Sequence, residues 1–251
     1  MIPSIQASAR WYETAFGPLT AEFWHVLSDP AQTARETDFI ASKLGAPKRA
    51  RLVDLACGDG RHAKALAARG LRVTGLDLSP AMLALAKDGT AGGNPRFIQA
   101  DMLDVHKFGP CDAAYLWGNS FGYLPHANTL EFLNRVAAVL EARGRFLVES
   151  GTVAECLLPR LQLESEFEAK GIRFEAKRRY AAQESALHIA YRISRGDHVE
   201  SFTARQAVYT SGELVRMFAA AGLALDGLYA DVDGTSFTLG AQRWIGCFRR
   251  A

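Results

Sequence analysis

The chain has 251 residues, of which 49% are hydrophobic, and this is enough for one large α/β domain with an appendage and a sizeable core. Its 29 Lys and Arg residues against 27 Asp and Glu residues give a formal net charge of +2, well short of the strongly basic balance of nucleic-acid binders. The charge therefore argues against a nucleic-acid partner and favours a small-molecule ligand.

Aromatic and apolar residues are interspersed with polar ones from about residue 8 to residue 45. Their spacing predicts about two amphipathic helices, which Pro18 and Pro30 are expected to break. We interpret residues 1–46 as an N-terminal helical lid and residues 47–251 as the main domain. Trp11 and Trp24 in the lid are expected to pack in the core rather than contact a ligand.

Short apolar runs that alternate with helical stretches follow Pro47 and fill residues 50–150. This alternation is typical of a parallel sheet that is covered by helices on both faces. Ser79 is predicted to cap a helix whose first residue is Pro80. The expected strands are Arg51–Leu55, Arg72–Leu76, Arg96–Gln99, Asp112–Trp117 and Gly144–Glu149, and the expected helices are Arg61–Arg69, Pro80–Ala86 and Asn128–Glu141.

The pattern changes after residue 150. Polar and apolar residues alternate through residues 172–209, with breaks at 182–184 and 195–197, which predicts a small antiparallel β insertion that caps the main domain. A helix that begins at Ser211 and ends at Gly222, then strands near Leu223–Tyr229 and Arg243–Phe248, complete a mostly parallel sheet of seven strands.

The orientation of six basic residues in the insertion bears on the charge of the expected substrate. They would form a solvated face if they point outward, but would favour an anionic substrate if they point inward, because Arg side chains bind carboxylates and phosphates well. These residues are Arg173, Lys177, Arg178, Arg179, Arg192 and Arg205.

The first expected strand ends in an acidic residue and runs into a glycine turn, Asp54-Leu55-Ala56-Cys57-Gly58-Asp59-Gly60. Gly58 and Gly60 allow the backbone to approach a nucleotide closely, and Ala56 also leaves room. Asp54 can accept hydrogen bonds from a cationic ligand group or brace the loop. A glycine turn alone is a weak signal, since such turns are often only structural.

Further polar residues stand where later strands end. Asp77 ends the second expected strand, 17 residues after Gly60, where a carboxylate can accept from both hydroxyls of a ribose. Asp101 follows the third strand, and the loop with Asn119 and Tyr123 follows the fourth. Because ligands of open α/β sheets bind beyond the carboxyl ends of the strands, we expect these residues to line one site.

These motifs together resemble class I S-adenosylmethionine-dependent methyltransferases of the small-molecule type. The first motif is matched by Asp54, Ala56, Gly58 and Gly60, with Ala56 where the family usually has glycine. The resemblance extends through Asp77 and the stretch Asn119-Ser120-Phe121-Gly122-Tyr123 and spans about residues 10–150. It implies a Rossmann-like fold and S-adenosyl-L-methionine as the cofactor.

The resemblance also implies roles for individual residues. Asp77 would hold the ribose, Asp101 would accept from the adenine amino group, and Leu78 and Met102 would sandwich the base. The full set of expected cofactor-binding residues is Asp54, Ala56, Gly58, Gly60, Asp77, Leu78, Asp101, Met102, Trp117 and Asn119.

Methyl transfer from a sulfonium is an in-line displacement that needs orientation and exclusion of water rather than a metal or a covalent nucleophile. An N or O acceptor must lose a proton, so we name His126, Tyr123 and Tyr12 as candidate catalytic residues. The histidines show no spacing typical of metal ligands, and no metal is expected. The methyl acceptor is predicted to be a small molecule.

Two alternative functions stay open at this point. A nicotinamide-dependent oxidoreductase also has glycines after its first strand, but its Gly-x-Gly-x-x-Gly motif has a third glycine that the stretch Ala56-x-Gly58-x-Gly60-x-His62 lacks. A methyltransferase-like regulatory protein would bind the cofactor without turnover. An RNA methyltransferase is disfavoured, because no basic stretch with interleaved aromatic residues is visible.

The cysteines and the chain ends indicate the compartment. Four well-separated cysteines without a Cys-x-x-Cys pair suggest buried thiols in a reducing environment. No basic and apolar leader and no run of about 18 apolar residues is present, so we expect a cytoplasmic protein without a membrane segment. A homodimer is possible on this evidence.

Overall fold

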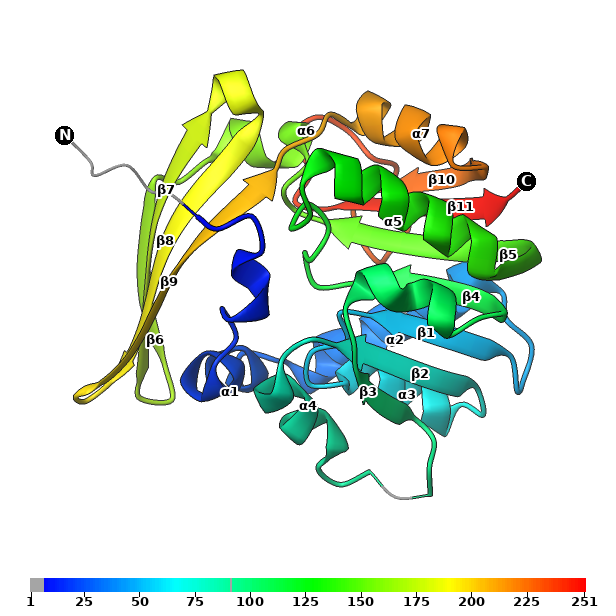
Figure 1. Ribbon diagram of the computed structural model, residues 1–251, viewed down its shortest axis with the longest axis horizontal. Helices are drawn as coiled ribbons and strands as arrows, with labels where there is room; N and C mark the ends of the chain where they lie inside the picture. Colours follow the sequence, from blue (N-terminus) through cyan, green and yellow to red (C-terminus); the bar gives the residue numbers. More distant parts are fainter. Residues whose placement is uncertain (1–6, 91) are drawn as a thin grey trace.

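Seven strands form the main sheet of the computed structural model, which describes residues 7–90 and 92–251 (Figure 1). Their spatial order is β10-β11-β5-β4-β1-β2-β3. The five strands from β3 to β5 run parallel, and β10 and β11 are antiparallel to their neighbours. The strands are β1 (Arg51–Leu55), β2 (Arg72–Asp77), β3 (Arg96–Gln99), β4 (Cys111–Leu116), β5 (Leu140–Ser150), β10 (Leu223–Tyr229) and β11 (Trp244–Arg250).

Helices cover both faces of this sheet because its central strands are apolar on both sides. In β4, Ala114 and Leu116 pack in the core under α5 (His126–Val139) and α7 (Ser211–Ala220). The alternate residues Ala113 and Tyr115 pack in the second core, under α2 (Pro30–Leu44) and α3 (Arg61–Ala68). The predicted Rossmann-like arrangement of seven strands is therefore confirmed.

A separate four-stranded antiparallel sheet has the order β6-β7-β8-β9. Its strands are β6 (Glu164–Ala169), β7 (Ile172–Ala181), β8 (Ala186–Arg195) and β9 (His198–Ala207). The predicted breaks at 182–184 and 195–197 are confirmed as the connections between β7, β8 and β9. The strand β6 was not predicted, because its sequence is mostly exposed and polar and pairs only with β7.

The N-terminal segment lies between the two sheets (Figure 1). It contains the short helix η1 (Trp11–Glu13) and the helix α1 (Pro18–Val26). Pro18 and Pro30 do not break helices as predicted. They begin α1 and α2, since the first helical position needs no backbone N–H donor. The first six residues of the predicted lid lie outside the described residues.

Other boundaries differ by a few residues. The helix α5 ends at Val139, two residues earlier than predicted, and β5 begins at once at Leu140 rather than at Gly144. The predicted cap at Ser79 is confirmed, because its hydroxyl accepts from the Met82 backbone N–H and α4 (Pro80–Lys87) begins at the next residue. The remaining short helices are η2 (Met102–Lys107), α6 (Ala154–Leu157), η3 (Leu158–Arg160) and η4 (Ala182–Glu184). Among the described residues, no helix has the length and apolar character needed to cross a membrane.

Candidate active site

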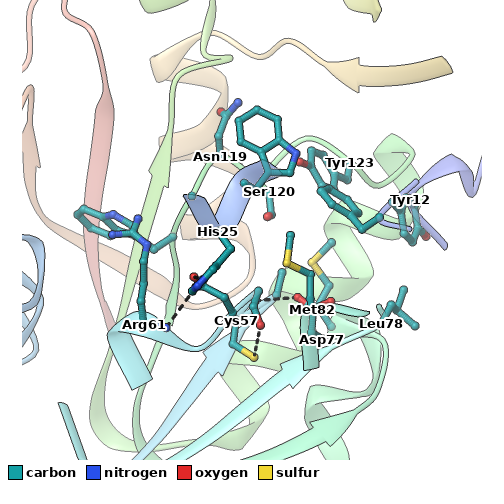
Figure 2. Close-up of a pocket in the computed structure, with 18 of the residues that line it drawn as sticks. Tyr12, His25, Cys57, Arg61, Asp77, Leu78, Met82, Asn119, Ser120 and Tyr123 are labelled. Carbon is teal, nitrogen blue, oxygen red and sulfur yellow. Dashed lines mark hydrogen bonds and ion pairs between the residues drawn. The ribbon is translucent and has the colours of Figure 1, made fainter. Parts of the chain in front are cut away.

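A cavity of about 340 Å³ lies at the carboxyl ends of β1, β2 and β4, beneath the N-terminal segment and the antiparallel sheet (Figure 2). Figure 2 shows Asp77 and Met82 on one side of it and Asn119 and Ser120 on the other. The chain contributes to this cavity from six separate regions. The lining residues are Trp11, Tyr12, Phe16, Trp24, His25, Ser28, Ala56, Cys57, Gly58, Asp59, Arg61, His62, Asp77, Leu78, Met82, Ala100, Asp101, Met102, Trp117, Gly118, Asn119, Ser120, Tyr123, Tyr191, Phe202 and Gln206.

The two glycines of the first loop have different roles, one at the cavity and one in packing. Both have positive φ, +56° at Gly58 and +72° at Gly60, where side chains are strained. A Cβ atom on Gly58 would meet nothing closer than the Met82 sulfur at 4.0 Å, so this glycine borders the cavity. A Cβ atom on Gly60 would lie 2.4 Å from the Phe97 ring. Gly60 is therefore needed for packing, and it does not line the cavity.

Asp77 holds the backbone of this loop. Its Oδ2 atom accepts from the Gly58 N–H at 2.8 Å, and its Oδ1 atom accepts from the Ser79 N–H at 2.9 Å. Burial raises the pKa of the carboxyl, while these backbone donors act against the rise. The carboxylate thus ties the end of β2 to the glycine turn after β1 and still borders the cavity.

Asp54 lies deeper than Asp77. It is buried, its Oδ2 atom has no hydrogen-bond partner, and burial raises the pKa of its carboxyl to about 8. Tyr115 on β4 pairs in register with Asp54, and its buried hydroxyl likewise makes no hydrogen bond of normal geometry. Asp54 does not line the cavity but stands directly behind the loop that does.

Asp101 contributes a further carboxylate just after the end of β3. The Oδ1 atom of Asp101 accepts from the Leu103 N–H at 2.9 Å and so caps η2. Its Oδ2 atom lies 3.0 Å from a guanidinium nitrogen of Arg10. Leu78 and Met102 line the same part of the cavity.

Hydrogen bonds to residues in and just after β5 fix the loop that follows β4. The buried Glu149 accepts at 3.0 Å from the backbone N–H groups of Gly118 and Asn119, and burial raises the pKa of its carboxyl. The Asn119 side-chain oxygen accepts from the Gly151 N–H at 2.8 Å. Asn119 has φ of +66°, a strained conformation that these contacts stabilise. Trp117 precedes the loop and also lines the cavity.

Aromatic rings form the opposite wall. The centroid of the Trp11 ring lies 4.6 Å from that of Tyr123 and 6.2 Å from that of Phe202, on which Trp11 stacks. Tyr12 stacks on Tyr123 with ring centroids 6.5 Å apart (Figure 2). Burial raises the pKa of the Tyr12 and Tyr123 hydroxyls. Both hydroxyls therefore keep their protons at neutral pH and can donate hydrogen bonds.

Most of the residues predicted from the sequence line this cavity. Asp54, Gly60 and His126 do not. His126 is the first residue of α5, and its Nδ1 atom lies 3.2 Å from the hydroxyl of Tyr209. The predicted residues in the lining are Tyr12, Ala56, Gly58, Asp77, Leu78, Asp101, Met102, Trp117, Asn119 and Tyr123.

The sequence analysis missed a histidine and carboxylate pair in the lining. The Nδ1 atom of His25, on α1, lies 2.7 Å from Oδ2 of Asp59 in the glycine loop. The two residues are 34 positions apart, so only the folded chain brings them together. The place of Asp59 between the two glycines of the loop was the one sequence signal that pointed to it.

Comparison with known proteins assigns the family. A family model described as a methyltransferase domain matches residues 52–144. The putative methyltransferase YqeM of Bacillus subtilis is 37% identical over 116 residues, 45% of this chain and 46% of that protein. A dTDP-3-amino-3,6-dideoxy-alpha-D-glucopyranose N,N-dimethyltransferase of Streptomyces fradiae is 30% identical over 190 residues, 72% of each chain. The chain belongs to the S-adenosylmethionine-dependent methyltransferases.

The similarity to this methyltransferase family differs in extent between relatives. The matches cover about half the length of the first curated relatives, 46% and 56%. The fold is shared over nearly the whole chain with the CcbJ methyltransferase of Streptomyces caelestis, with a TM-score of 0.80, 20% identity and coverage of 95% of this chain and 99% of that one. The family assignment does not favour the nicotinamide-dependent oxidoreductase.

The residues of this methyltransferase fit the cofactor of its family. The backbone at Gly58 leaves open space in front of it, and Asp54 behind the loop has an unpartnered buried oxygen beside which a cationic group would be favoured. Asp77 and Asp101 place carboxylates at the ends of adjacent strands. We find in these features a donor and acceptor set suited to a ribose, an adenine amino group and a charged amino-acid tail.

Proposed function

We propose that the protein transfers the methyl group of S-adenosyl-L-methionine to an amine nitrogen or a hydroxyl oxygen of a small-molecule acceptor. The observation that carries this proposal is the two-sided cavity. Its polar side comes from the loops after β1, β2 and β3, and its aromatic side comes from the N-terminal segment, the loop after β4 and the antiparallel sheet. Such a cavity suits one polar nucleotide and one separate ring-bearing acceptor.

The cofactor belongs on the polar side in this proposal. Asp77 binds the ribose hydroxyls, Asp101 accepts from the adenine amino group, and Leu78 and Met102 contact the two faces of the base. Trp117 and Asn119 border the amino-acid end. When bound, S-adenosyl-L-methionine supplies a methyl carbon that is activated by the adjacent sulfonium.

An amine is the better acceptor candidate than a hydroxyl. The relative from Streptomyces fradiae carries the name of an N,N-dimethyltransferase for an amino sugar. An amine also needs less help from the protein, because its pKa lies close enough to neutrality for one imidazole to remove its proton. Tyr12 and Tyr123 keep their protons, so we assign them the orientation of the acceptor by donated hydrogen bonds.

His25 is our candidate for the group that accepts the proton. It lines the cavity, and Asp59 holds its Nδ1 atom, which leaves Nε2 as the atom that can receive a proton. His126 has no part in this proposal, since its ring lies against Tyr209 outside the lining. Within the predicted lid 1–46, the segment from Trp11 to Ser28 would close over both ligands, because it lines the cavity whereas α2 packs on a face of the main sheet. The insertion at 172–209 would complete the acceptor side.

Binding and turnover test the proposal separately. Isothermal titration calorimetry should show micromolar binding of S-adenosylhomocysteine and no binding of NADH. A labelled methyl donor with a panel of small amines and phenols should then give a methylated product. Cofactor binding without any product would support the regulatory alternative, and binding of NADH alone would refute the proposal. The cytoplasmic location, the absence of a nucleic-acid partner and the homodimer stay predictions from the sequence.

A further inference from the structure

The acceptor side of the cavity contains a polar side chain, Gln206, that the described part of the fold leaves without a partner. Gln206 on β9 is 3% exposed and lines the cavity, and its carboxamide makes no hydrogen bond within the described part of the chain. Its amide atoms are not among the buried polar atoms without a partner in the described residues, so they are open to the space of the cavity. Its neighbours on the same face of β9, Phe202 and Ala204, are apolar. The amide is thus the polar group on an apolar face of β9.

Hydrogen bonds of the two neighbouring residues fix the position of Gln206 on β9. The next residue, Ala207, donates its N–H to the carbonyl of Gly122 at 2.8 Å, which joins β9 to the loop after β4. The preceding residue, Arg205, accepts at its carbonyl from the Trp11 indole N–H at 2.9 Å. The strand is therefore tied on both sides of Gln206, to the two elements that carry Tyr123 and Trp11.

A second polar group ends the same wall. Tyr191 on β8 pairs in register with Phe202, and its hydroxyl makes no hydrogen bond that the described residues supply. Burial raises the pKa of this hydroxyl to about 12, so it stays protonated and can donate. Four residues of extended strand separate the registers of Tyr191 and Gln206, about 13 Å. Apolar surface lies between these two polar groups.

The same wall has no cation for a phosphate or a carboxylate. Among the described lining residues, the cationic or titratable nitrogen groups are His25, Arg61 and His62. Arg61 lies 2.8 Å from Glu36, His62 lies 2.9 Å from the same carboxylate, and His25 is paired with Asp59. Three carboxylates, Asp59, Asp77 and Asp101, also border the cavity and disfavour an anion.

The basic residues of the insertion do not change this balance. Arg173 and Arg192 pair with Glu175, and Lys177 lies 3.8 Å from Glu164. Arg178 bonds to Ser165 and Arg205 to Glu184, while Arg179 is exposed. None of the six lines the cavity, so the condition under which they would favour an anionic substrate is not met.

We infer that the acceptor is a ring-bearing amine without phosphate or carboxylate groups, and that Gln206 is a specificity-determining residue that hydrogen-bonds its polar substituent. The inference rests on the proposed methyl transfer and narrows its acceptor class. It sets this chain apart from the named acceptor of the Streptomyces fradiae relative, which carries a dTDP group. The apolar face of the acceptor would pack on Phe202 and Trp11.

Matched acceptor pairs test this class. The probes are tyramine and tyramine phosphate, glucosamine and glucosamine 6-phosphate, and the methyl glycoside of 3-amino-3,6-dideoxyglucose with its dTDP-linked form. For at least one pair we expect the phosphate-free member to be methylated with a kcat/KM at least tenfold above that of its phosphate-bearing partner. Equal or better methylation of the phosphate-bearing members, or methylation of none of the phosphate-free ones, overturns the inference.

Gln206→Leu tests the residue. Loss of one hydrogen bond to the acceptor should raise KM for the phosphate-free acceptor about fivefold to tenfold, with kcat within twofold. Calorimetry should show weaker binding of the same acceptor to the protein saturated with S-adenosylhomocysteine, and unchanged binding of S-adenosylhomocysteine itself. Gln183→Leu, at an exposed position outside the cavity, is the matched control.

Different results would contradict the proposed function and the role of Gln206. If the wild-type protein does not bind S-adenosylhomocysteine, the proposed function is wrong. If it binds S-adenosylhomocysteine and methylates an acceptor, but Gln206→Leu leaves the KM and the acceptor affinity unchanged, only the role of Gln206 is wrong.

Discussion

Asp77 combines a structural and a binding role in one carboxylate. Its oxygens already accept from Gly58 and Ser79, and the group borders the cavity where the ribose is proposed to bind. Asp77→Asn keeps the size but replaces one acceptor oxygen with a donor. We expect the Kd for S-adenosylhomocysteine to rise at least tenfold by calorimetry, because one acceptor bond and the negative charge are lost. Asp88→Asn, at an exposed position after α4, should leave the affinity unchanged.

His25 gives a second prediction for single residues. If its imidazole receives the acceptor proton, His25→Gln should lower kcat at least tenfold, since general base catalysis contributes about 100-fold or more. Asp59→Asn should lower kcat less, because the imidazole remains. The affinity for S-adenosylhomocysteine should change by less than threefold in His25→Gln. His106→Gln, which lies outside the cavity lining, is the control, and a wild-type kcat in His25→Gln would exclude the assigned role.

Sequence reasoning succeeds for residues whose place follows from a strand end. Asp77 and Asp101 lie in the cavity because each stands at the carboxyl end of a strand of the parallel sheet, Asp77 as the last residue of β2 and Asp101 two residues after β3. His25 and Gln206 belong to elements whose orientation towards that sheet depends on tertiary packing, so spacing alone could not identify them. His126 follows the right loop in the chain, but the start of α5 turns it towards Tyr209.

At the level of elements, a buried carboxylate joins α2, α3 and β11. Glu36 is almost fully buried and lies within hydrogen-bond distance of Arg61, His62 and Arg243. Burial acts to raise the pKa of Glu36, but the hydrogen bonds from His62 and Arg243 and the charge of Arg61 outweigh it and hold the pKa well below its usual value. Arg61 and His62 also line the cavity, so this cluster connects the fold to the site.

Glu36→Gln should therefore destabilise the protein by about 2–4 kcal/mol at pH 7, because two guanidinium groups lose their shared counter-ion. An acid with a depressed pKa stabilises the folded chain above its unfolded pKa, and this contribution decreases as the pH falls towards the folded value. The difference in free energy of unfolding between wild type and variant should shrink from pH 7 to pH 3.5 in urea titrations. Glu168→Gln on the exposed edge strand β6 is the control, and a difference that does not depend on pH would contradict the assignment.

The elements themselves were predictable to different degrees. Buried strands such as β1 have apolar runs between turn residues, and their boundaries agree closely with the sequence pattern. The edge strand β6 has alternating acidic residues that resemble a loop, and only its pairing with β7 makes it a strand. Pro18 and Pro30 were correctly placed at helix boundaries but on the wrong side, because a proline that ends one helix and one that begins the next look alike in a sequence.

At the scale of the whole molecule, the two sheets contribute different kinds of information. The parallel direction of the five strands from β3 to β5 follows from the βα alternation and brings the predicted polar residues to one edge. The acceptor wall needs the antiparallel sheet to face that edge, with Phe202 and Gln206 inward and the charged alternate residues outward. One residue of slip in register would reverse those faces, and a single sequence does not determine that choice.

The stability of the whole protein should depend on the protonation of Asp54. Burial raises the pKa of this carboxyl from 3.8 to about 8 in the folded chain. An acid with a raised pKa holds its proton more tightly when folded, so its contribution to the free energy of unfolding is present at low pH and is lost as the pH rises towards 8. Without ligand, we expect the Tm of wild type to fall between pH 5 and pH 9 more steeply than that of Asp54→Asn, so that the variant is more stable by at least about 2 °C at pH 9.

The same variant should bind S-adenosylhomocysteine at least tenfold more weakly, because a cationic group of the ligand would lose its counter-charge behind the loop. Asp112→Asn, at a half-exposed position on β4, should show the wild-type slope and the wild-type affinity. Parallel Tm curves for wild type and Asp54→Asn across this range would contradict the raised pKa and show that Asp54 is ionised in the folded protein.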